Sequence, residues 1–282
     1  KEKNVRDPIK YDIVEVKRFI ETIPFELSVD QKNVCNEIFR DFKNIHPANR
    51  LIQGDVGSGK TIVALISAFA MVTAKKQVVI MAPTEILASQ HYEYFRKMLS
   101  GFNVNIGLFT GTTTKSNRNI ILSNLRSGEC DIVIGTHALF YEDITYKNLG
   151  LVIIDEQHRF GVKARNNLFN DQSAVDALFL SATPIPRTLG LTIFGDLDIS
   201  TIKTARANKK SVETKVFLVD DIDIVLDNVE EEIKKGHQVY FVVSAIESEF
   251  DDSRFDILDV NNLLSQRFPN YKIGTLHGKV KE

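Results

Sequence analysis

Short apolar runs and longer amphipathic segments alternate along most of this 282-residue chain. The runs are rich in β-branched residues and have the length of strands that are buried on both faces. They predict strands at residues 50–53, 77–82, 104–109, 131–134, 149–154 and 177–181. Segments of helical length accompany them at residues 31–43, 60–73, 85–99 and 118–127. This order is typical of an α/β fold in which helices cover both faces of a parallel sheet.

The pattern changes after residue 200, where a polar and basic stretch at residues 200–213 has the composition of an interdomain linker. Apolar residues then recur at helical spacing over residues 222–233, with acidic side chains at the start and Lys234, Lys235 and Gly236 at the end, as helix-dipole and capping preferences favour. The same region predicts strands at residues 212–219, 238–244 and 271–276 and a helix at residues 256–268. We therefore expect a second α/β domain with about half as many strands as the first.

Composition narrows the class of protein. With 43% hydrophobic and 26% charged residues, the chain is not of a disordered type. Its longest apolar run, residues 62–72, is shorter than the roughly 18–20 residues that cross a bilayer, so we expect no membrane partner. Cys35 and Cys130 lie 95 positions apart without metal-ligand spacing, which argues against a disulfide framework or a structural metal cluster and favours a cytoplasmic setting. The sequence opens without methionine and without a secretory signal, as a piece of a longer chain would.

Charge is distributed unevenly along the chain. Residues 211–282 carry a net charge of −7, which leaves +5 for residues 1–210. The positive excess in the first part would suit a polyanionic ligand, but an ordinary mixed-charge surface explains so small an excess about as well. Charge alone does not identify the partner.

A phosphate-binding motif follows the first predicted strand. The motif fits the pattern GxxxxGK[ST] of a P-loop and reads Gly54-Asp55-Val56-Gly57-Ser58-Gly59-Lys60-Thr61. Its glycines let backbone N–H groups surround phosphates, and the start of the following helix favours negative charge. Lys60 would reach the outer phosphates, and the Thr61 hydroxyl would ligate Mg²⁺. A flexible glycine turn is the alternative, but the strand before the motif and the helix after it favour a nucleotide site.

Two carboxylates end the strand predicted at residues 149–154. At the carboxyl edge of a parallel sheet, such side chains face the ligand crevice. Since a P-loop lies about 100 residues earlier, we expect Asp155 to hold Mg²⁺ together with Thr61, and Glu156 to orient and deprotonate the attacking water. A solvated strand end is the structural alternative.

Two other strand ends carry small or hydroxylic residues suited to contacts with phosphates, around Thr84 and Thr136. A third strand end, at Ser181, is followed by prolines that fit a helix start with Thr183 as its cap. Helix capping explains Thr84 equally well. His137 and His158 could be ordinary hydrogen-bonded histidines at strand ends. The chemistry of these segments alone leaves both interpretations open.

In their order, these segments resemble the motor of superfamily 2 helicases, and within them the RecG family of bacterial DNA helicases. The resemblance covers about residues 20–282 and rests on the motifs at residues 25–31, 54–61, 81–91, 134–139, 154–162 and 181–189. It implies two RecA-like domains with ATP and Mg²⁺ between them, and an ATP-dependent helicase or translocase that remodels branched DNA, such as stalled forks and Holliday junctions, in recombination and repair. The catalytic residues would be Lys60, Asp155, Glu156, Gln157 and His158.

The resemblance also assigns roles to single residues. Gln31 would recognise adenine, and residues 54–61 would hold the triphosphate. Contact with DNA, or coupling of DNA to the nucleotide, would fall to Pro83, Thr84, Gly111, Thr136, His137, Ser181, Thr183, His277 and Gly278. Gln157 and His158 would share in that coupling.

The same resemblance implies a domain organisation. Residues 1–22 would be a charged connecting segment, residues 23–204 the first RecA-like, ATP-binding domain, and residues 205–282 the start of a truncated second one. A strand-separating wedge domain would precede this chain, and an arginine finger would follow residue 282, so the chain alone is expected to hydrolyse ATP poorly. The linker lacks the Pro-Gly sequence expected around residues 205–210.

Other functions remain open at this point. An Mfd-like double-stranded DNA translocase has a very similar motor, but it usually has glutamate where this chain has Gln157 and phenylalanine where it has Ser58. A nucleotide-dependent binding module without turnover is disfavoured by Glu156. A small-molecule kinase is disfavoured because no substrate lid or acceptor pocket is evident.

Overall fold

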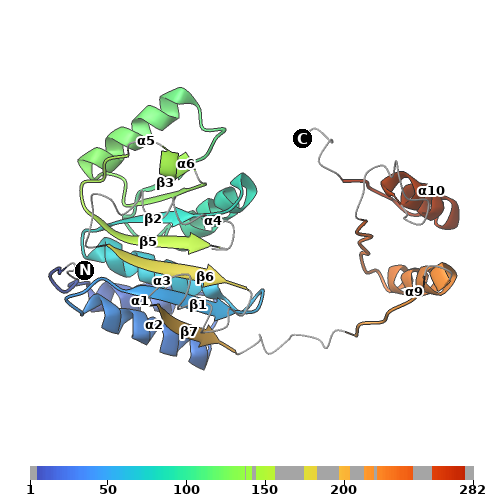
Figure 1. The fold of residues 1–282 in the computed structure, drawn as a ribbon, viewed down its shortest axis with the longest axis horizontal. Coiled ribbons are helices and arrows are strands. Elements are labelled where there is room, and N and C mark those ends of the chain that lie inside the picture. The colour runs from blue at the N-terminus through green and yellow to red at the C-terminus, as the bar shows by residue number, and fades with distance from the viewer. Residues whose placement is uncertain are drawn as a thin grey trace. The chain divides into compact units, whose positions relative to one another are not determined.

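The computed structural model describes residues 5–136, 138–141, 144–155, 175–182, 197–203, 213–218, 221–243 and 256–276 (Figure 1). The chain divides into two compact units, Lys1–Lys209 and Lys210–Glu282. Each unit is described by itself below. None of the described helices is both long enough and apolar enough to cross a membrane.

The first unit is built on one parallel sheet of seven strands, which confirms the predicted α/β class. Its strands follow the order β3-β4-β2-β5-β6-β1-β7, so the first strand of the chain lies far from the second. Their bounds are β1 (Asn49–Gly54), β2 (Gln77–Met81), β3 (Ile106–Phe109), β4 (Ile132–Gly135), β5 (Leu149–Asp155), β6 (Asp176–Ser181) and β7 (Asp198–Ile202).

Strand β7 corrects one expectation. The polar composition of residues 200–213 indicated a linker from residue 200 onward, whereas the chain pairs with β1 as far as Ile202, opposite Gly54. The strand is polar because it lies at the edge of the sheet, where only part of its surface is buried. A linker that starts after residue 203 lies outside the described residues.

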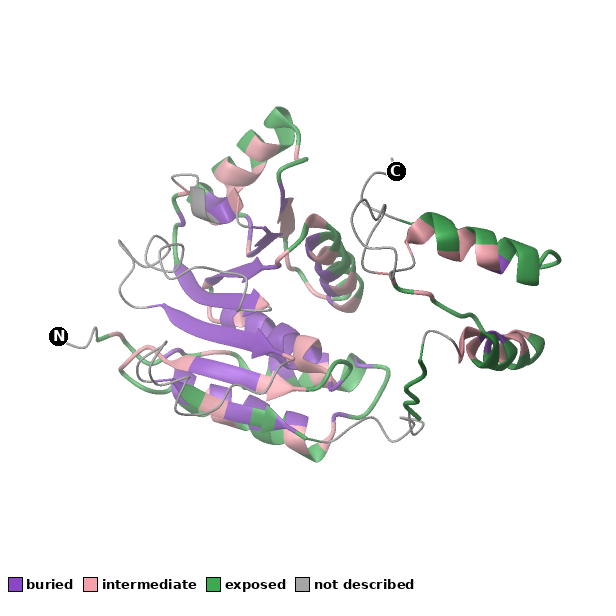
Figure 2. Ribbon diagram, turned by 45° about the vertical axis from the view of Figure 1, so that its right-hand side comes forward, coloured by how far each residue is buried: buried purple, intermediate pink, exposed green. Residues whose placement is uncertain are grey.

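Helices cover both faces of the sheet, as predicted. On one face lie α1 (Ile13–Thr22), α2 (Val29–Phe42), α3 (Lys60–Thr73) and α4 (Glu85–Met98), and on the other lie α5 (Lys115–Ser127) and the short α6 (Ala138–Tyr141). Consecutive strand residues alternate between the two cores: Ile52 joins the first and Leu51 the second. Both are fully buried, and Figure 2 shows the central strands and α3 as the most deeply buried elements.

The segment before residue 23 packs closely on this unit. Val16 and Phe19 of α1 are buried in the first core, and the Phe19 ring lies 5.0 Å from Phe69 and 5.5 Å from Phe102, measured between centroids. An Asp12 cap begins the helix by accepting two backbone N–H bonds. The charged residues of this segment therefore coexist with an apolar face that is part of the core.

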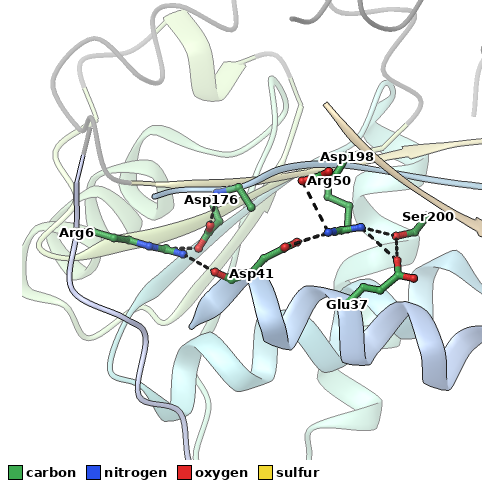
Figure 3. Close-up of polar contacts among 8 residues, drawn as sticks. Arg6, Glu37, Asp41, Arg50, Asp176, Asp198 and Ser200 are labelled. Carbon is green, nitrogen blue, oxygen red and sulfur yellow. Dashed lines mark hydrogen bonds and ion pairs between the residues drawn. The ribbon is translucent and has the colours of Figure 1, made fainter. Parts of the chain in front are cut away.

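A network of charged side chains lies near the amino ends of β1, β6 and β7, opposite the strand ends that carry the P-loop (Figure 3). Arg50 binds both carboxylate oxygens of Asp41, at 2.5 and 2.9 Å, and its Nη1 donates to Ser200 at 2.9 Å. Arg6, from the segment before α1, pairs with Asp176. Both members of each pair are nearly buried, so the network fastens α2 and the amino-terminal segment to the sheet.

The second unit contains α9 (Ile222–Lys234) and α10 (Ile257–Arg267), which confirm the two predicted helices. They share a small core of Leu226, Val229, Leu264 and Phe268. The strands predicted at residues 212–219, 238–244 and 271–276 are wrong for their described parts, which carry no strand. A strand needs a hydrogen-bonded neighbour, and these segments leave apolar side chains in solvent: Val216, Val242 and Leu276 are 93%, 93% and 86% exposed.

Candidate nucleotide-binding site

The P-loop and Asp155 come together at the carboxyl edge of the sheet. The loop follows β1, Ser181 ends β6, and Asp155 ends β5, and these three strands are neighbours in the order β5-β6-β1. The register places Gln53 opposite Ser181, and Asp155 opposite Leu180. Residues that are about 100 positions apart in the chain therefore share one side of the sheet, as the sequence analysis expected.

Two glycines give the P-loop its shape. Gly57 and Gly59 have φ angles of 80° and 84°, a region that other residues adopt only with strain. Gly59 is the N-cap of α3, whose amino end has no cap from a described side chain. Lys60, the first residue of α3, turns back over the loop and donates from Nζ to the carbonyl oxygens of Gly54 and Asp55, at 2.6 and 3.1 Å. The loop thus presents backbone N–H groups and an ammonium group at a helix start, the combination that binds phosphate.

The buried side chain of Gln31 supports this loop from α2. Ser28 and Gln31 form a capping box, in which Gln31 N–H donates to Ser28 Oγ at 3.2 Å and Ser28 N–H donates to Gln31 Oε1 at 2.9 Å. The other end of the Gln31 amide, Nε2, donates to the carbonyl oxygen of Ser58 at 2.8 Å. Recognition of adenine by Gln31 stays a prediction, and the structure adds a second task for the same side chain.

The residues present fit a bound triphosphate. Ser58 Oγ is buried and has no hydrogen-bond partner among the described residues, which is costly unless a ligand or solvent supplies one. Nothing lies within 4 Å of the position that a Cβ on Gly57 would take, so the loop is open on that side. Val56 is 85% exposed, although its side chain is apolar. These features favour a loop that is completed by another molecule.

Asp155 has a partner that the sequence analysis did not identify. His91 Nε2 lies 2.7 Å from Asp155 Oδ2, and only 11% and 15% of the two side chains are exposed. His91 lies on α4 with Ala88 and Phe95, the other buried residues of that helix. Their spacing of three and four positions was the available signal, because it puts the histidine on the core face of the helix.

The residues expected along the DNA path lie on the other half of the same edge. Pro83 and Thr84 follow β2, Gly111 follows β3, and Thr136 follows β4. The Thr84 hydroxyl caps α4 by accepting from Leu87 N–H at 3.2 Å, so the capping interpretation holds for this residue. Thr84 and Gly111 are exposed, whereas Thr136 is 2% exposed.

Glu85 joins two of these segments, since it begins α4 and accepts a hydrogen bond from Thr112 Oγ1 at 2.9 Å. A Cβ on Gly111 would lie 2.7 Å from Glu85 Oε1, so the glycine permits the close approach. The loop after β3 is thereby fixed to the start of α4.

Several expected site residues lie outside the described residues, and their roles stay predictions: Glu156, Gln157, His158, His137, Thr183, His277 and Gly278. Within the described part of the chain, no three His, Cys, Asp or Glu side chains are grouped so that they could hold a metal ion. Cys35 and Cys130 are buried free thiols, and burial raises the pKa of each to about 12.

Comparison with known families and curated proteins points to helicases. The family model of the DEAD/DEAH box helicases matches residues 28–191. The ATP-dependent DNA helicase RecG of Borreliella burgdorferi is 44% identical over 94% of this chain and 39% of its own length. RecG of Thermotoga maritima is 42% identical over 100% of this chain and 36% of its own length. The chain thus spans about two fifths of the length of the curated relatives that it matches.

Solved structures give the same result. A structure of RecG bound to a three-way DNA junction has a TM-score of 0.78 and 40% identity, over 94% of this chain and 34% of that one. The DEAD-box helicase Mss116, bound to single-stranded RNA and a nucleotide analogue, has a TM-score of 0.58 over 80% of this chain and 51% of that one. Its identity of 18% supports a likeness of fold alone.

Proposed function

Because this chain belongs to the DEAD/DEAH box helicase family, we propose that it is the ATP-driven motor segment of a RecG-type helicase that remodels branched DNA. Residues 23–204 would form the first RecA-like domain, and residues 205–282 the start of the second. The observation that carries the proposal is the placement of the P-loop and Asp155 at the carboxyl ends of β1 and β5, the two strands that flank β6 in one parallel sheet.

The nucleotide would bind at the start of α3. Backbone N–H groups of residues 57–61 would contact the phosphates, and Lys60 would move from its carbonyl partners to the outer phosphates. Thr61 and Asp155 would hold Mg²⁺, which when bound neutralises charge that develops on the phosphates. Glu156 would orient the attacking water and accept its proton.

Branched DNA is the proposed partner because the solved RecG that is similar over 94% of this chain is bound to a three-way junction. Thr84 and Gly111 follow strands on the half of the edge away from the P-loop, so DNA and nucleotide would share the edge without overlap. Stalled forks and Holliday junctions are the proposed substrates, with roles in recombination and repair. The two buried free thiols suit a cytoplasmic protein.

Phosphate release at saturating Mg-ATP, with and without a forked DNA, tests the proposal. This chain should bind ATP and turn it over slowly, and a chain extended to the length of the RecG relatives should be stimulated by the fork. Glu156→Gln in the extended chain should lower turnover by about 100-fold or more and leave ATP binding nearly intact, since the amide has the shape of the carboxylate but cannot accept the proton.

Three results would contradict this function. Failure of the extended chain to hydrolyse ATP would indicate a binding module. Equal stimulation by a linear duplex and by a fork would favour a double-stranded DNA translocase. Full, DNA-stimulated turnover by the chain of 282 residues alone would show that no further arginine is needed.

A further inference from the structure

The contact between His91 and Asp155 lies at the proposed metal site but comes from a helix outside the P-loop. Helix α4 brings the imidazole to the end of β5, where its Nε2 is 2.7 Å from Asp155 Oδ2. The Phe95 ring packs edge-on against the imidazole, with centroids 6.5 Å apart and planes at 73°. Because His91 is 9% exposed, the surrounding core restricts its ring to a small range of orientations.

Only one of the two side chains can donate the hydrogen bond in this contact. An aspartate carboxylate only accepts hydrogen bonds, so His91 must carry a hydrogen on Nε2 and donate it. This bond occupies Oδ2 and fixes the rotation of the carboxylate, which leaves Oδ1 as the oxygen that is better placed to face a cation. Carboxylates that bind metal ions are commonly held by such outer partners, and loss of the partner typically lowers metal affinity 10- to 100-fold.

We propose that His91 is a positioning residue, which holds the Asp155 carboxylate in the orientation that binds the Mg²⁺ of Mg-ATP. The inference rests on the proposed function, in which Asp155 is a ligand of that ion. It goes beyond that function because it gives α4, a helix that contributes nothing to the P-loop, a direct part in metal binding. His91 itself touches neither nucleotide nor metal.

The test measures metal dependence and not turnover. A fluorescent ATP analogue is titrated into the chain at a series of Mg²⁺ concentrations, and separately in excess chelator. His91→Phe should raise the half-saturating Mg²⁺ concentration about 10- to 100-fold, because the ring volume is kept and the donor is lost. The affinity measured in chelator should change less than about twofold. His91→Gln keeps an N–H donor, so its half-saturating Mg²⁺ concentration should stay close to that of the unchanged chain.

Two further variants complete the design. Gln90→Ala, at the exposed neighbouring position of α4, is the matched control and should leave the Mg²⁺ dependence unchanged. Asp155→Asn should by itself raise the half-saturating Mg²⁺ concentration. Adding His91→Phe to Asp155→Asn should then raise it almost no further, since the two residues act as one unit. Thermal unfolding of each variant checks that the sheet and α4 remain folded.

The outcomes separate the inference from the function. If Asp155→Asn leaves the Mg²⁺ dependence unchanged, the proposed role of Asp155 fails, and the inference fails with it. If Asp155→Asn has its effect while His91→Phe has none, the function stands and the inference is wrong. A loss of nucleotide affinity that is equal with Mg²⁺ and with chelator would show that His91 only supports the fold.

Discussion

Gln31 Nε2 donates to the carbonyl oxygen of Ser58 at 2.8 Å, which joins the first turn of α2 to the middle of the P-loop. The oxygen of the same amide accepts the N–H of Ser28, so one side chain caps α2 and holds the loop. The contact is tight: a Cβ on Gly59 would lie 2.2 Å from Gln31 Nε2. The conformation of the phosphate-binding loop therefore depends on α2 as well as on its own glycines.

Gln31→Glu should weaken binding of every nucleoside triphosphate, because a carboxylate cannot donate to Ser58 and would repel its carbonyl oxygen. Loss of such a buried hydrogen bond costs on the order of 1–3 kcal/mol, which corresponds to about 5- to 150-fold in affinity. Titrations with fluorescent analogues of ATP and GTP measure the loss of affinity. The control is Lys32→Ala, because the Lys32 side chain is exposed. If ATP binding falls while GTP binding does not, adenine recognition is the only task of Gln31.

Lys60→Ala should remove most of the affinity for Mg-ATP. The Lys60 ammonium is held at 2.6 Å from the Gly54 carbonyl oxygen, within the loop that would surround the phosphates. A charge-assisted contact is worth about 1.5–3 kcal/mol, so calorimetry should show a loss of at least about 10-fold. Lys75→Ala, just beyond the other end of α3, should bind normally. Binding within twofold of the unchanged chain would refute the assignment of the P-loop.

The P-loop could be predicted from sequence because its conformation is decided locally, by glycines at positions with positive φ and by the helix that follows. Strands β1 to β6 were predictable for a similar reason, since apolar runs mark strands that are buried on both faces. The pairing of His91 with Asp155 was not predictable, because it joins residues 64 positions apart and depends on the rotation of α4. In the motif at residues 81–91, His91 follows the polar residues Ser89 and Gln90, and nothing in that motif identifies Asp155 as its partner.

The features that were predicted wrongly or missed, namely β7, the strands of the second unit and the partners of Arg50, also have physical causes. Strand β7 is polar because it lies at the sheet edge, so its composition indicated a linker. The segments of the second unit are apolar like strands, but a strand is defined by the neighbour with which it pairs. The partners of Arg50 were hidden because Asp41 is nine positions earlier and Ser200 is 150 positions later. Charge patterning along the sequence carries no signal for such contacts.

DNA binding by this chain should be weak and strongly dependent on salt, because contacts at strand ends and loops would go to phosphates. With about four phosphate contacts, affinity should fall roughly 100-fold between about 50 and 200 mM salt. Lys115→Ala, at the exposed start of α5 after the loop of Gly111, should reduce the salt slope by about one. Lys43 is exposed before the amino end of β1, and Lys43→Ala should leave the salt slope unchanged. A salt-independent affinity or a preference for one base sequence in fluorescence titrations would contradict this.

Arg50→Lys should destabilise the first unit although the charge is kept. The guanidinium binds both oxygens of Asp41 and also donates to Ser200, which one ammonium cannot reproduce. We expect a loss of about 2–4 kcal/mol in the free energy of unfolding, since buried carboxylates would lose partners. Urea unfolding followed by circular dichroism measures it. Arg40 is exposed in the last turn of α2, and Arg40→Lys should change stability by less than about 0.5 kcal/mol. An equal loss of stability in Arg50→Lys and Arg40→Lys would mean that the bidentate geometry is unimportant.

Arg6→Met should cost more stability at high pH than at low pH. Burial raises the pKa of Asp176 to about 6, although the hydrogen bond from Arg6 works in the opposite direction. The folded state therefore takes up a proton below about pH 6 that the unfolded chain, with a carboxyl pKa of 3.8, does not yet hold. Stability from the protonated form is complete below the unfolded pKa and is lost as pH rises through the folded pKa. Without Arg6, that pKa should rise further, since a favourable partner of the charged form is gone.

At pH 8 the variant must either bury an ionised carboxylate without its partner or protonate it against the solution pH, which should cost about 3–5 kcal/mol. At pH 5 the carboxyl group is largely protonated, so the same substitution should cost much less. Urea unfolding of Arg6→Met at both pH values measures the difference, with Lys10→Met on the exposed side of the same segment as control. In an Asp176→Asn background the pH dependence of the Arg6→Met effect should disappear, because the carboxyl group that pairs with Arg6 is gone. If the pH dependence persists in the Asp176→Asn background, a group other than Asp176 causes it, and the prediction that Arg6 and Asp176 are coupled to pH is wrong.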